Sequence, residues 1–175
     1  MTHLILAAIL ALIPAPSPNW GETDQEFRAR AASIAEAIAK ASEIARPVQR
    51  RQIAMAIVVV FWGESRFSPF VQSGEHRGDG GAALCLGGLH QLSLSDEEWR
   101  GLAGLDLEST TRCATVAAKR LKSAWWYCHD LDPKFGWPAA FVLYGSGRTC
   151  RAEETSWKGI FNDRAEKWAA LVAMK

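Results

Sequence analysis

The sequence lacks an excess of charge of either sign, and it has no internal repeat or internal linker. Its 175 residues carry 20 basic and 19 acidic side chains, which gives a formal net charge of +1. This balance argues against a dedicated nucleic-acid binder, because such proteins use a basic excess to displace counterions from phosphate. A hydrophobic fraction of 49% excludes wholesale disorder. The length predicts a single domain.

Long apolar runs are also missing. The run from Leu4 to Ile13 has ten residues, which is too short to cross a bilayer, and three prolines follow it within residues 14–18. This pattern predicts that residues 1–18 are a signal peptide and that residues 19–175 form the domain. The alternative is an apolar N-terminal helix that packs on the core or touches a membrane. The first interpretation places the protein outside the cytoplasm, in the periplasm, in the medium or in a phage particle.

The four cysteines include no C-x-x-C pair, so we predict no metal site, and no cofactor motif is present. Their even number indicates disulfides, which form in exported proteins. If residues 107–129 are one helix, Cys113 and Cys128 lie about 22 Å apart along its axis and cannot pair. Two connectivities stay open: Cys85 with Cys113 and Cys128 with Cys150, or Cys85 with Cys128 and Cys113 with Cys150. Four reduced cysteines in a cytosolic protein are the alternative.

Helical periodicity dominates the pattern. A capping box at Thr23 and Glu26 predicts a helix that ends near Arg46. Pro47 suits the first turn of a second helix, which contains the wholly apolar segment from Ile53 to Trp62. Its valines would also suit a buried strand, but we predict a helix at the centre of the core.

Further helices are predicted from Ser95 to Trp99, over residues 107–129 and over residues 137–144. A last helix is predicted to be capped by Asn162 or Asp163. The glycine-rich region around residues 73–92 predicts an irregular loop or small β-hairpin. The fold class is therefore mostly α, in a single domain.

Glu64 is the most informative polar residue. It directly follows Phe61-Trp62-Gly63, at the end of the most hydrophobic segment of the chain. Apolar walls destabilise an ionised carboxylate, so we expect the pKa of Glu64 to be raised, as a general acid requires. The structural alternative is a helix-terminal carboxylate that reaches water or bonds to Ser65 and Arg66.

Three segments resemble, in order and spacing, the motifs of the soluble lytic transglycosylase and goose-type lysozyme superfamily. They are Glu64-Ser65-Arg66-Phe67, Gly88-Leu89-His90-Gln91-Leu92, and Ala140-Phe141 with Leu143-Tyr144-Gly145-Ser146-Gly147. The resemblance implies a lysozyme-like fold and cleavage of peptidoglycan glycan strands between N-acetylmuramic acid and N-acetylglucosamine. It implies that Glu64 is the essential acid and that Tyr144 packs beside it. It also implies that the substrate is bound by Ser65, Gly88, Leu89, His90 and Gln91.

The sequence departs from the family pattern at two of these positions. His90 stands where the family has Met, and Gly145 stands where it has Asn. His90 is a candidate titratable donor in the cleft, although a solvent-facing histidine without a catalytic role is the favoured interpretation. The missing Asn motivates an alternative function, a non-catalytic glycan-binding or structural protein of a secretion, conjugation or phage assembly.

Asp79 is a candidate second carboxylate. Some goose-type lysozymes are thought to use an aspartate on a loop after the glutamate as a base, whereas a transglycosylase needs none. The structural alternative for Asp79 is a turn residue that bonds to its own backbone or pairs with Arg77. For Trp125 and Trp126 we favour core packing of both over a sugar subsite.

The implied partners are peptidoglycan strands and no nucleic acid. The chain leaves no room for a separate wall-binding domain, so a protein partner in the wall or in a secretion machine would be needed to localise it. We expect a monomer. A membrane-associated accessory protein, anchored by the apolar segment from Leu4 to Ile13, is a further alternative.

Overall fold

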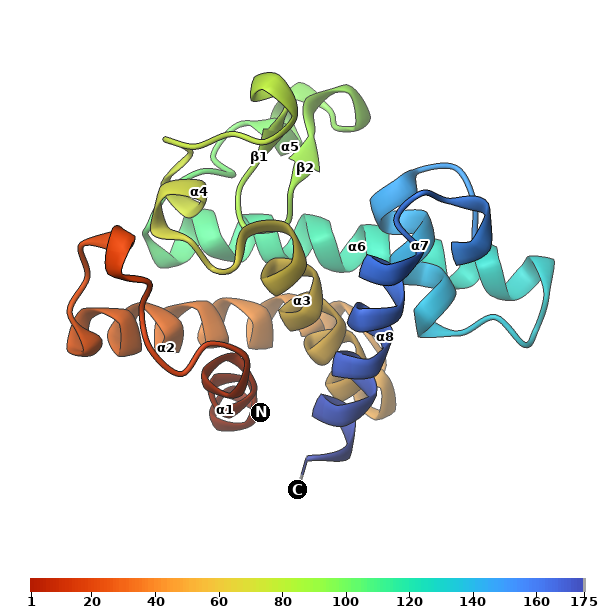
Figure 1. Cartoon of the computed structure of the whole chain (residues 1–175), viewed down its shortest axis with the longest axis horizontal. Helices are drawn as coiled ribbons and strands as arrows, with labels where there is room; N and C mark the ends of the chain where they lie inside the picture. Colours follow the sequence, from red (N-terminus) through yellow and green to blue (C-terminus); the bar gives the residue numbers. More distant parts are fainter. Residues whose placement is uncertain (175) are drawn as a thin grey trace.

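The computed structural model describes residues 1–174, apart from the side chains of Asp79 and Ser93. It is mostly helical, which confirms the predicted fold class. Figure 1 shows the long helices below a small hairpin, with the short helix α5 beside the strands. The α-helices are α1 (Thr2–Leu12), α2 (Asp24–Ala41), α3 (Arg50–Ser65), α4 (Pro69–Ser73), α5 (Asp96–Trp99), α6 (Leu107–Leu131), α7 (Trp137–Ser146) and α8 (Lys158–Ala173). The strands are β1 (Ala83–Leu84) and β2 (Leu89–His90).

The central helix is α3, as the sequence predicted. Every residue from Ile53 to Phe61 is at most 2% exposed, and a helix that is apolar on all sides must be buried on all sides. It contacts α1, α2, α6 and α8. The three valines are accommodated in this helix because its neighbours supply apolar contacts in every direction.

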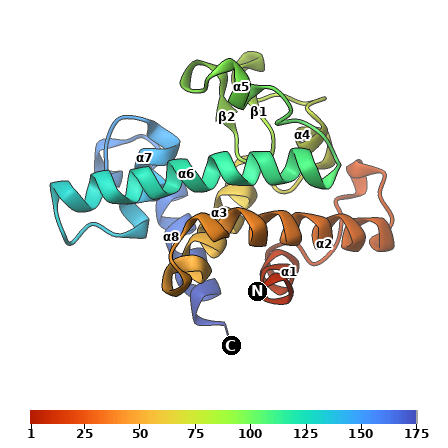
Figure 2. The same ribbon diagram turned by 180° about the vertical axis from the view of Figure 1, so that it is seen from behind.

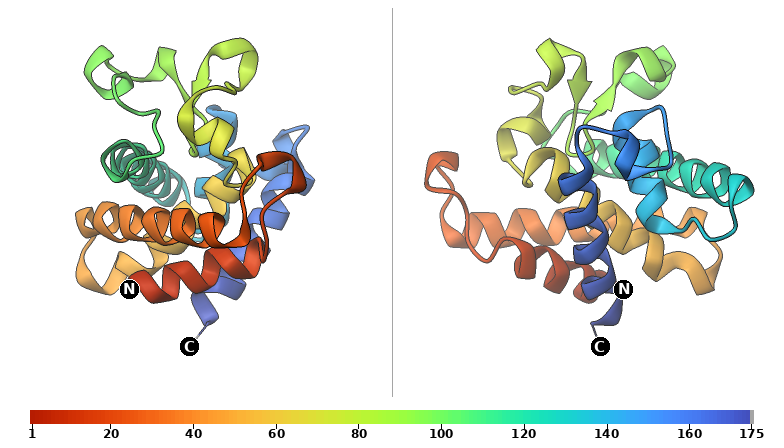
Figure 3. Two further views of the ribbon diagram at one scale, coloured as in Figure 1. Left: turned by 90° about the vertical axis from the view of Figure 1, so that its left-hand side faces the viewer. Right: turned by 45° about the vertical axis from the view of Figure 1, so that its right-hand side comes forward.

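Two long helices, α2 and α6, lie side by side on one face of α3, the face turned toward the viewer in Figure 2. Figure 3 shows α8 beside α3 on the opposite side. The α1 helix packs on α2 and α3 and buries Ile5, Ala8 and Ile9 completely. In the uncut chain the N-terminal segment is therefore a packed helix, and its removal as a signal peptide stays a prediction. Within residues 1–174, no helix is both long enough and apolar enough to span a membrane.

Three helix boundaries differ from the predictions by more than two residues. The α3 helix begins at Arg50, and Pro47 starts a separate 3-10 turn over Pro47–Gln49. The α2 helix ends at Ala41, short of Arg46, and the chain tightens into a 3-10 turn over Ser42–Ile44. The last helix begins at Lys158, so the predicted cap at Asn162 or Asp163 is wrong. The Asp163 carboxylate pairs with Lys167 one turn further along, which accounts for its position inside the helix.

The predicted irregular region contains a two-stranded antiparallel sheet in which Ala83 pairs with His90 and Leu84 with Leu89. This hairpin is tied to α6 by the disulfide between Cys85 and Cys113, whose Cα atoms are 6.2 Å apart.

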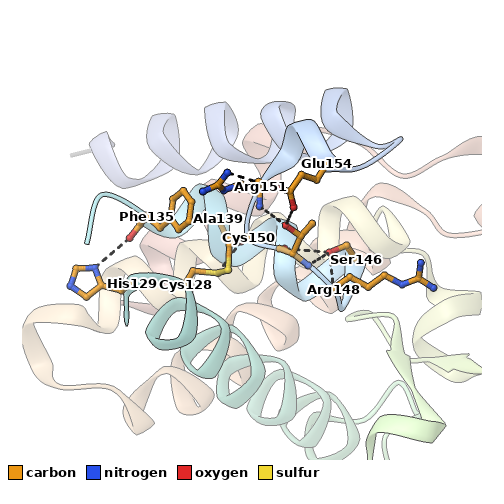
Figure 4. The surroundings of a disulfide bond; sticks show 10 residues. Cys128, His129, Phe135, Ala139, Ser146, Arg148, Cys150, Arg151 and Glu154 are labelled. Atoms are coloured by element: carbon orange, nitrogen blue, oxygen red, sulfur yellow. Dashed lines mark hydrogen bonds and ion pairs between the residues drawn. A yellow bond between two sulfur atoms is a disulfide. The ribbon is translucent and has the colours of Figure 1, made fainter. Parts of the chain in front are cut away.

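A second disulfide joins Cys128, near the end of α6, to Cys150 in the loop after α7 (Figure 4). The first of the two open connectivities is therefore the one present. The two disulfides indicate an oxidising compartment, and export stays a prediction.

The tryptophan pair in α6 is not wholly in the core. Trp125 is half-buried and stacks on His129 with ring centroids 4.8 Å apart. Trp126 is 47% exposed, so the expectation that both pack in the core is wrong. Neighbouring positions on a helix point about 100° apart, and only one of the two faces the protein.

Candidate active site

Glu64 occupies the last turn of α3, and an unusual turn follows it. Arg66 and Phe67 both have positive φ angles, of 54° and 57°, which is a strained conformation for bulky residues. The Ser65 hydroxyl donates to the carbonyl of Phe61 at 2.7 Å and accepts from the backbone N–H of Phe67 at 3.2 Å. Ser65 is buried. We therefore assign it to the helix end, in place of the predicted contact with substrate.

A buried arginine of α2 holds this turn from below. Arg30 donates through Nη1 to the carbonyl of Phe67 at 2.8 Å and to Oε1 of Gln72 at 3.1 Å. Its other nitrogens bind both carboxylate oxygens of Glu22 at 2.6 and 2.8 Å. A bidentate ion pair of this kind is rigid. The strained turn after Glu64 is thus fixed by contacts outside the segment that carries the motif.

The Glu64 carboxylate makes an ion pair with an arginine of the last helix. Nη2 of Arg164 lies 2.8 Å from Oε1 of Glu64, and the two side chains are 5% and 26% exposed. The sequence predicted only apolar walls around this carboxyl. That prediction was incomplete, because it lacked the arginine. The carboxyl therefore faces a buried cation as well as apolar walls.

Two glycines allow the last helix to approach so closely. A methyl group at Gly63 would lie 2.5 Å from Nε of Arg164, and one at Gly145 would lie 2.7 Å from Cε1 of Phe161. A methyl group at Gly63 would push the guanidinium of Arg164 aside, and one at Gly145 would push the ring of Phe161 aside. The glycine at position 145, noted above as a departure from the family motif, therefore has a packing reason in this chain.

Tyr144 and the Gly87-Gly88 backbone form the next wall of the site. The phenol donates to the carbonyl of Gly87 at 2.8 Å. Burial, and to a smaller extent the negative charge of Glu64, raises the pKa of Tyr144. Gly88 has a φ of +58°, and a methyl group there would lie 2.8 Å from Oε2 of Glu64. Both its conformation and its proximity to the carboxyl require glycine.

Glu64 lies between two hollows and lines both of them, together with Gly88. The hollow under the glycine-rich loop has a volume of about 310 Å³ and is also lined by Val71, His76, Arg77, Gly78, Ala83 and Cys85. The hollow next to α8 has a volume of about 300 Å³ and is also lined by Gly63, His90, Tyr144, Gly145, Trp157, Ile160, Phe161 and Arg164. The carboxyl therefore stands at the junction of two spaces that can each hold part of a ligand.

The remaining predicted residues are not all at this junction. His90 is half-buried and lines the α8 hollow, which is contrary to the favoured solvent-facing position. Leu89 is 1% exposed and belongs to the core, while Gln91 is exposed and lines neither hollow. The backbone of Asp79 begins a 3-10 turn. Its side chain lies outside the described residues, so its role as a base stays a prediction.

Two residues of the site were missed from the sequence, Arg164 and Trp157. Trp157 is 51% exposed and lines the α8 hollow beside Glu64. Neither residue lies in a motif. The packing of α8 against α3 brings Arg164 to the carboxyl, and Trp157 lines the same hollow. Among residues 1–174, no three histidine, cysteine, aspartate or glutamate side chains are placed to hold a metal ion.

Comparison of the chain with protein-family models, with curated proteins and with solved structures found no match.

Proposed function

We propose that the protein has a lysozyme-like fold and cleaves peptidoglycan as a lytic transglycosylase or muramidase, with Glu64 as the general acid and base. The observation that carries this proposal is the junction described above. One carboxyl stands between two hollows, and the three segments that resemble the family motifs all contribute to its surroundings: Glu64 from the first, Gly88 from the second and Tyr144 from the third.

The geometry suggests how the glycan would lie. A polysaccharide that crosses the junction would place sugar rings in both hollows and a glycosidic oxygen near Glu64. The exposed ring of Trp157 offers a flat apolar surface in the α8 hollow, against which a sugar face can stack. Trp157 is thus the proposed sugar contact, whereas core packing was favoured from the sequence for Trp125 and Trp126.

The chemistry starts with a proton on Glu64. The carboxyl donates it to the oxygen of the bond between N-acetylmuramic acid and N-acetylglucosamine, which leaves with the bonding electrons. The carboxylate then takes the proton of the 6-hydroxyl of the muramic acid, whose oxygen attacks the anomeric carbon and gives an anhydro end. In the hydrolytic version water is the nucleophile, and Asp79 is the candidate base that accepts its proton.

A second candidate function is favoured by the ion pair itself. One oxygen of the Glu64 carboxyl is already engaged by Nη2 of Arg164 at 2.8 Å, as in an ion pair that serves the packing of α3 against α8. This observation supports the alternative of a non-catalytic glycan-binding or structural protein of a secretion, conjugation or phage assembly. In both cases the expected ligand is the glycan strand, and the expected setting is outside the cytoplasm.

The two functions are separated by product analysis. Purified peptidoglycan is incubated with the protein or with the Glu64→Gln variant, and soluble fragments are identified by mass spectrometry. The enzymatic proposal predicts fragments from the wild type alone, with anhydro ends for transglycosylation and reducing ends for hydrolysis. Absence of fragments from folded wild-type protein that still binds the glycan would overturn it in favour of the non-catalytic function.

A further inference from the structure

Arg164 is the best-buried charged residue next to Glu64, and its hydrogen bonds are incomplete. The residue is 4% exposed. Its Nη2 pairs with Glu64, while Nε and Nη1 are buried without a hydrogen-bond partner. Burying a guanidinium with two unmatched donors is costly. Such a cost at a site lined by titratable groups is typical of a residue kept for function.

We propose that Arg164 is a positioning residue for the reaction of Glu64: it binds Oε1 and thereby leaves Oε2 to carry and donate the proton. This role rests on the proposed function. The substrate is the same glycan strand. A helix outside the three motif segments, α8, thereby completes the site.

The directions of the two carboxyl oxygens support this assignment. Oε1 points to Arg164 of α8, and Oε2 points to the side of Gly88, where a methyl group would come within 2.8 Å of it. An oxygen that accepts a hydrogen bond from a cation is a poor place for a proton, so the proton of the neutral acid belongs on Oε2. Gly88 lines both hollows, so Oε2 faces the place where they meet.

Arg164 also favours the carboxylate that remains after the proton has been donated. The other charged or titratable groups that line the two hollows are Tyr144 of α7, His90 of β2, and His76 and Arg77 of the loop before β1. Without the guanidinium, the carboxylate formed in the reaction loses its cationic partner.

The test displaces the guanidinium in two independent ways. Arg164→Met removes the guanidinium. Gly63→Ala changes neither Glu64 nor Arg164, but its new methyl group would lie 2.5 Å from Nε and so pushes the guanidinium aside. Gly159→Ala is the matched control, since a methyl group there meets nothing within 4 Å. We expect both site variants to cleave peptidoglycan about 100-fold more slowly, the cost of misplacing a reacting group by about 1 Å. The control should keep wild-type activity.

Chemical rescue tests whether the guanidinium itself is needed. An Arg164→Ala variant should regain activity when guanidinium ions are added at concentrations too low to unfold the protein. Full activity of Gly63→Ala and Arg164→Met, or no rescue of folded Arg164→Ala, would overturn the proposal.

Stability measurements separate this proposal from the proposed function. Urea unfolding is followed for Glu64→Gln, Arg164→Met and the double variant. Coupling requires that the double variant loses less stability than the sum of the two single losses, and strict additivity would overturn the contact itself. If the stabilities show coupling between Glu64 and Arg164 but the wild type is inactive, the proposed function is overturned, and with it the positioning role of Arg164.

Discussion

Two arginine–glutamate pairs of the described residues lie beside hollows of equal volume, and the candidate site is at only one of them. Glu64 and Arg164 are 2.8 Å apart with side chains 26% and 5% exposed. Glu154 and Arg151 are 3.9 Å apart with side chains 50% and 58% exposed. The hollow next to each pair has the same volume, about 300 Å³. Volume therefore does not distinguish the two regions.

The difference lies in where the partners come from. Glu154 and Arg151 are three residues apart on one short turn, and such an exposed pair contributes little to stability. Glu64 and Arg164 are brought together by the packing of α3 against α8, and strand β2 and helix α7 close the other sides. Convergence of remote segments on one carboxyl is the feature that marks the first region as the site.

The largest expected effect comes from two glycines with nearly the same backbone conformation. Gly88 and Gly147 have φ angles of +58° and +65°, but a methyl group would meet Glu64 at Gly88 and nothing at Gly147. Both changes to alanine should cost about 1–2 kcal/mol of stability from backbone strain. Peptidoglycan cleavage should fall about 100-fold in Gly88→Ala alone. Equal cleavage rates of Gly88→Ala and Gly147→Ala would contradict the assignment of the site to the region around Glu64.

The disulfides provide the next contrast. They close loops with sequence separations of 28 and 22 residues, so each should contribute a similar 2–5 kcal/mol by constraining the unfolded chain. Replacing Cys85 and Cys113 by serine should also lower activity of the folded protein, because this bond ties the hairpin that carries Gly87 and Gly88.

Replacing Cys128 and Cys150 by serine should lower the stability of the protein but not the activity of its folded form. The check is thermal unfolding together with the cleavage rate measured well below the unfolding midpoint. Equal losses of activity in the two double variants would contradict the account.

The two half-exposed tryptophans sharpen the comparison for binding. Trp157 is 51% exposed and lines the hollow beside Glu64, while Trp126 is 47% exposed on α6. In a Glu64→Gln background, Trp157→Ala should weaken glycan binding about tenfold, which corresponds to the loss of one aromatic contact. Trp126→Ala should leave it unchanged. Isothermal titration with a soluble glycan fragment measures both affinities. A larger loss of affinity in Trp126→Ala than in Trp157→Ala would place the sugar contact on α6.

The smallest effect is expected at Tyr144. Tyr144→Phe removes the hydrogen bond to Gly87 and should cost about 1 kcal/mol. Because the pKa of the phenol is raised in the folded state from its ordinary value of 10.0, its contribution is complete below pH 10 and is lost as the pH rises above it. Stability should therefore fall more steeply above pH 10 in the wild type than in Tyr144→Phe. Parallel curves from urea unfolding would show that the phenol is not buried as described.

The sequence predicted the mostly helical fold, the buried α3 and the hairpin region, because each depends on local periodicity, capping and glycine content. It narrowed the disulfides to two connectivities from helix geometry alone. The start of α8 was mispredicted, because Asp163 has the residue type of a cap but pairs with Lys167 inside the helix.

The site was predicted only as far as its motifs extend. Glu64, Gly88, His90 and Tyr144 line the hollows, and their roles in binding and catalysis stay predictions. Arg164 could not be found, because nothing in a single helix reveals which distant glycines will admit its guanidinium. The one hint in the sequence of a close helix contact is the pair Gly63 and Gly145. Each glycine lies next to a candidate site residue, inside a helix in which no turn requires glycine.

The measurement closest to the central claim is a crystal structure of the Glu64→Gln protein with a tetrasaccharide from the glycan strand. The account predicts sugar rings in both hollows, with one ring on Trp157 and the oxygen between N-acetylmuramic acid and N-acetylglucosamine within hydrogen-bond distance of residue 64. A tetrasaccharide bound beside the disulfide of Cys128 and Cys150, with the Glu64 junction empty, would contradict it.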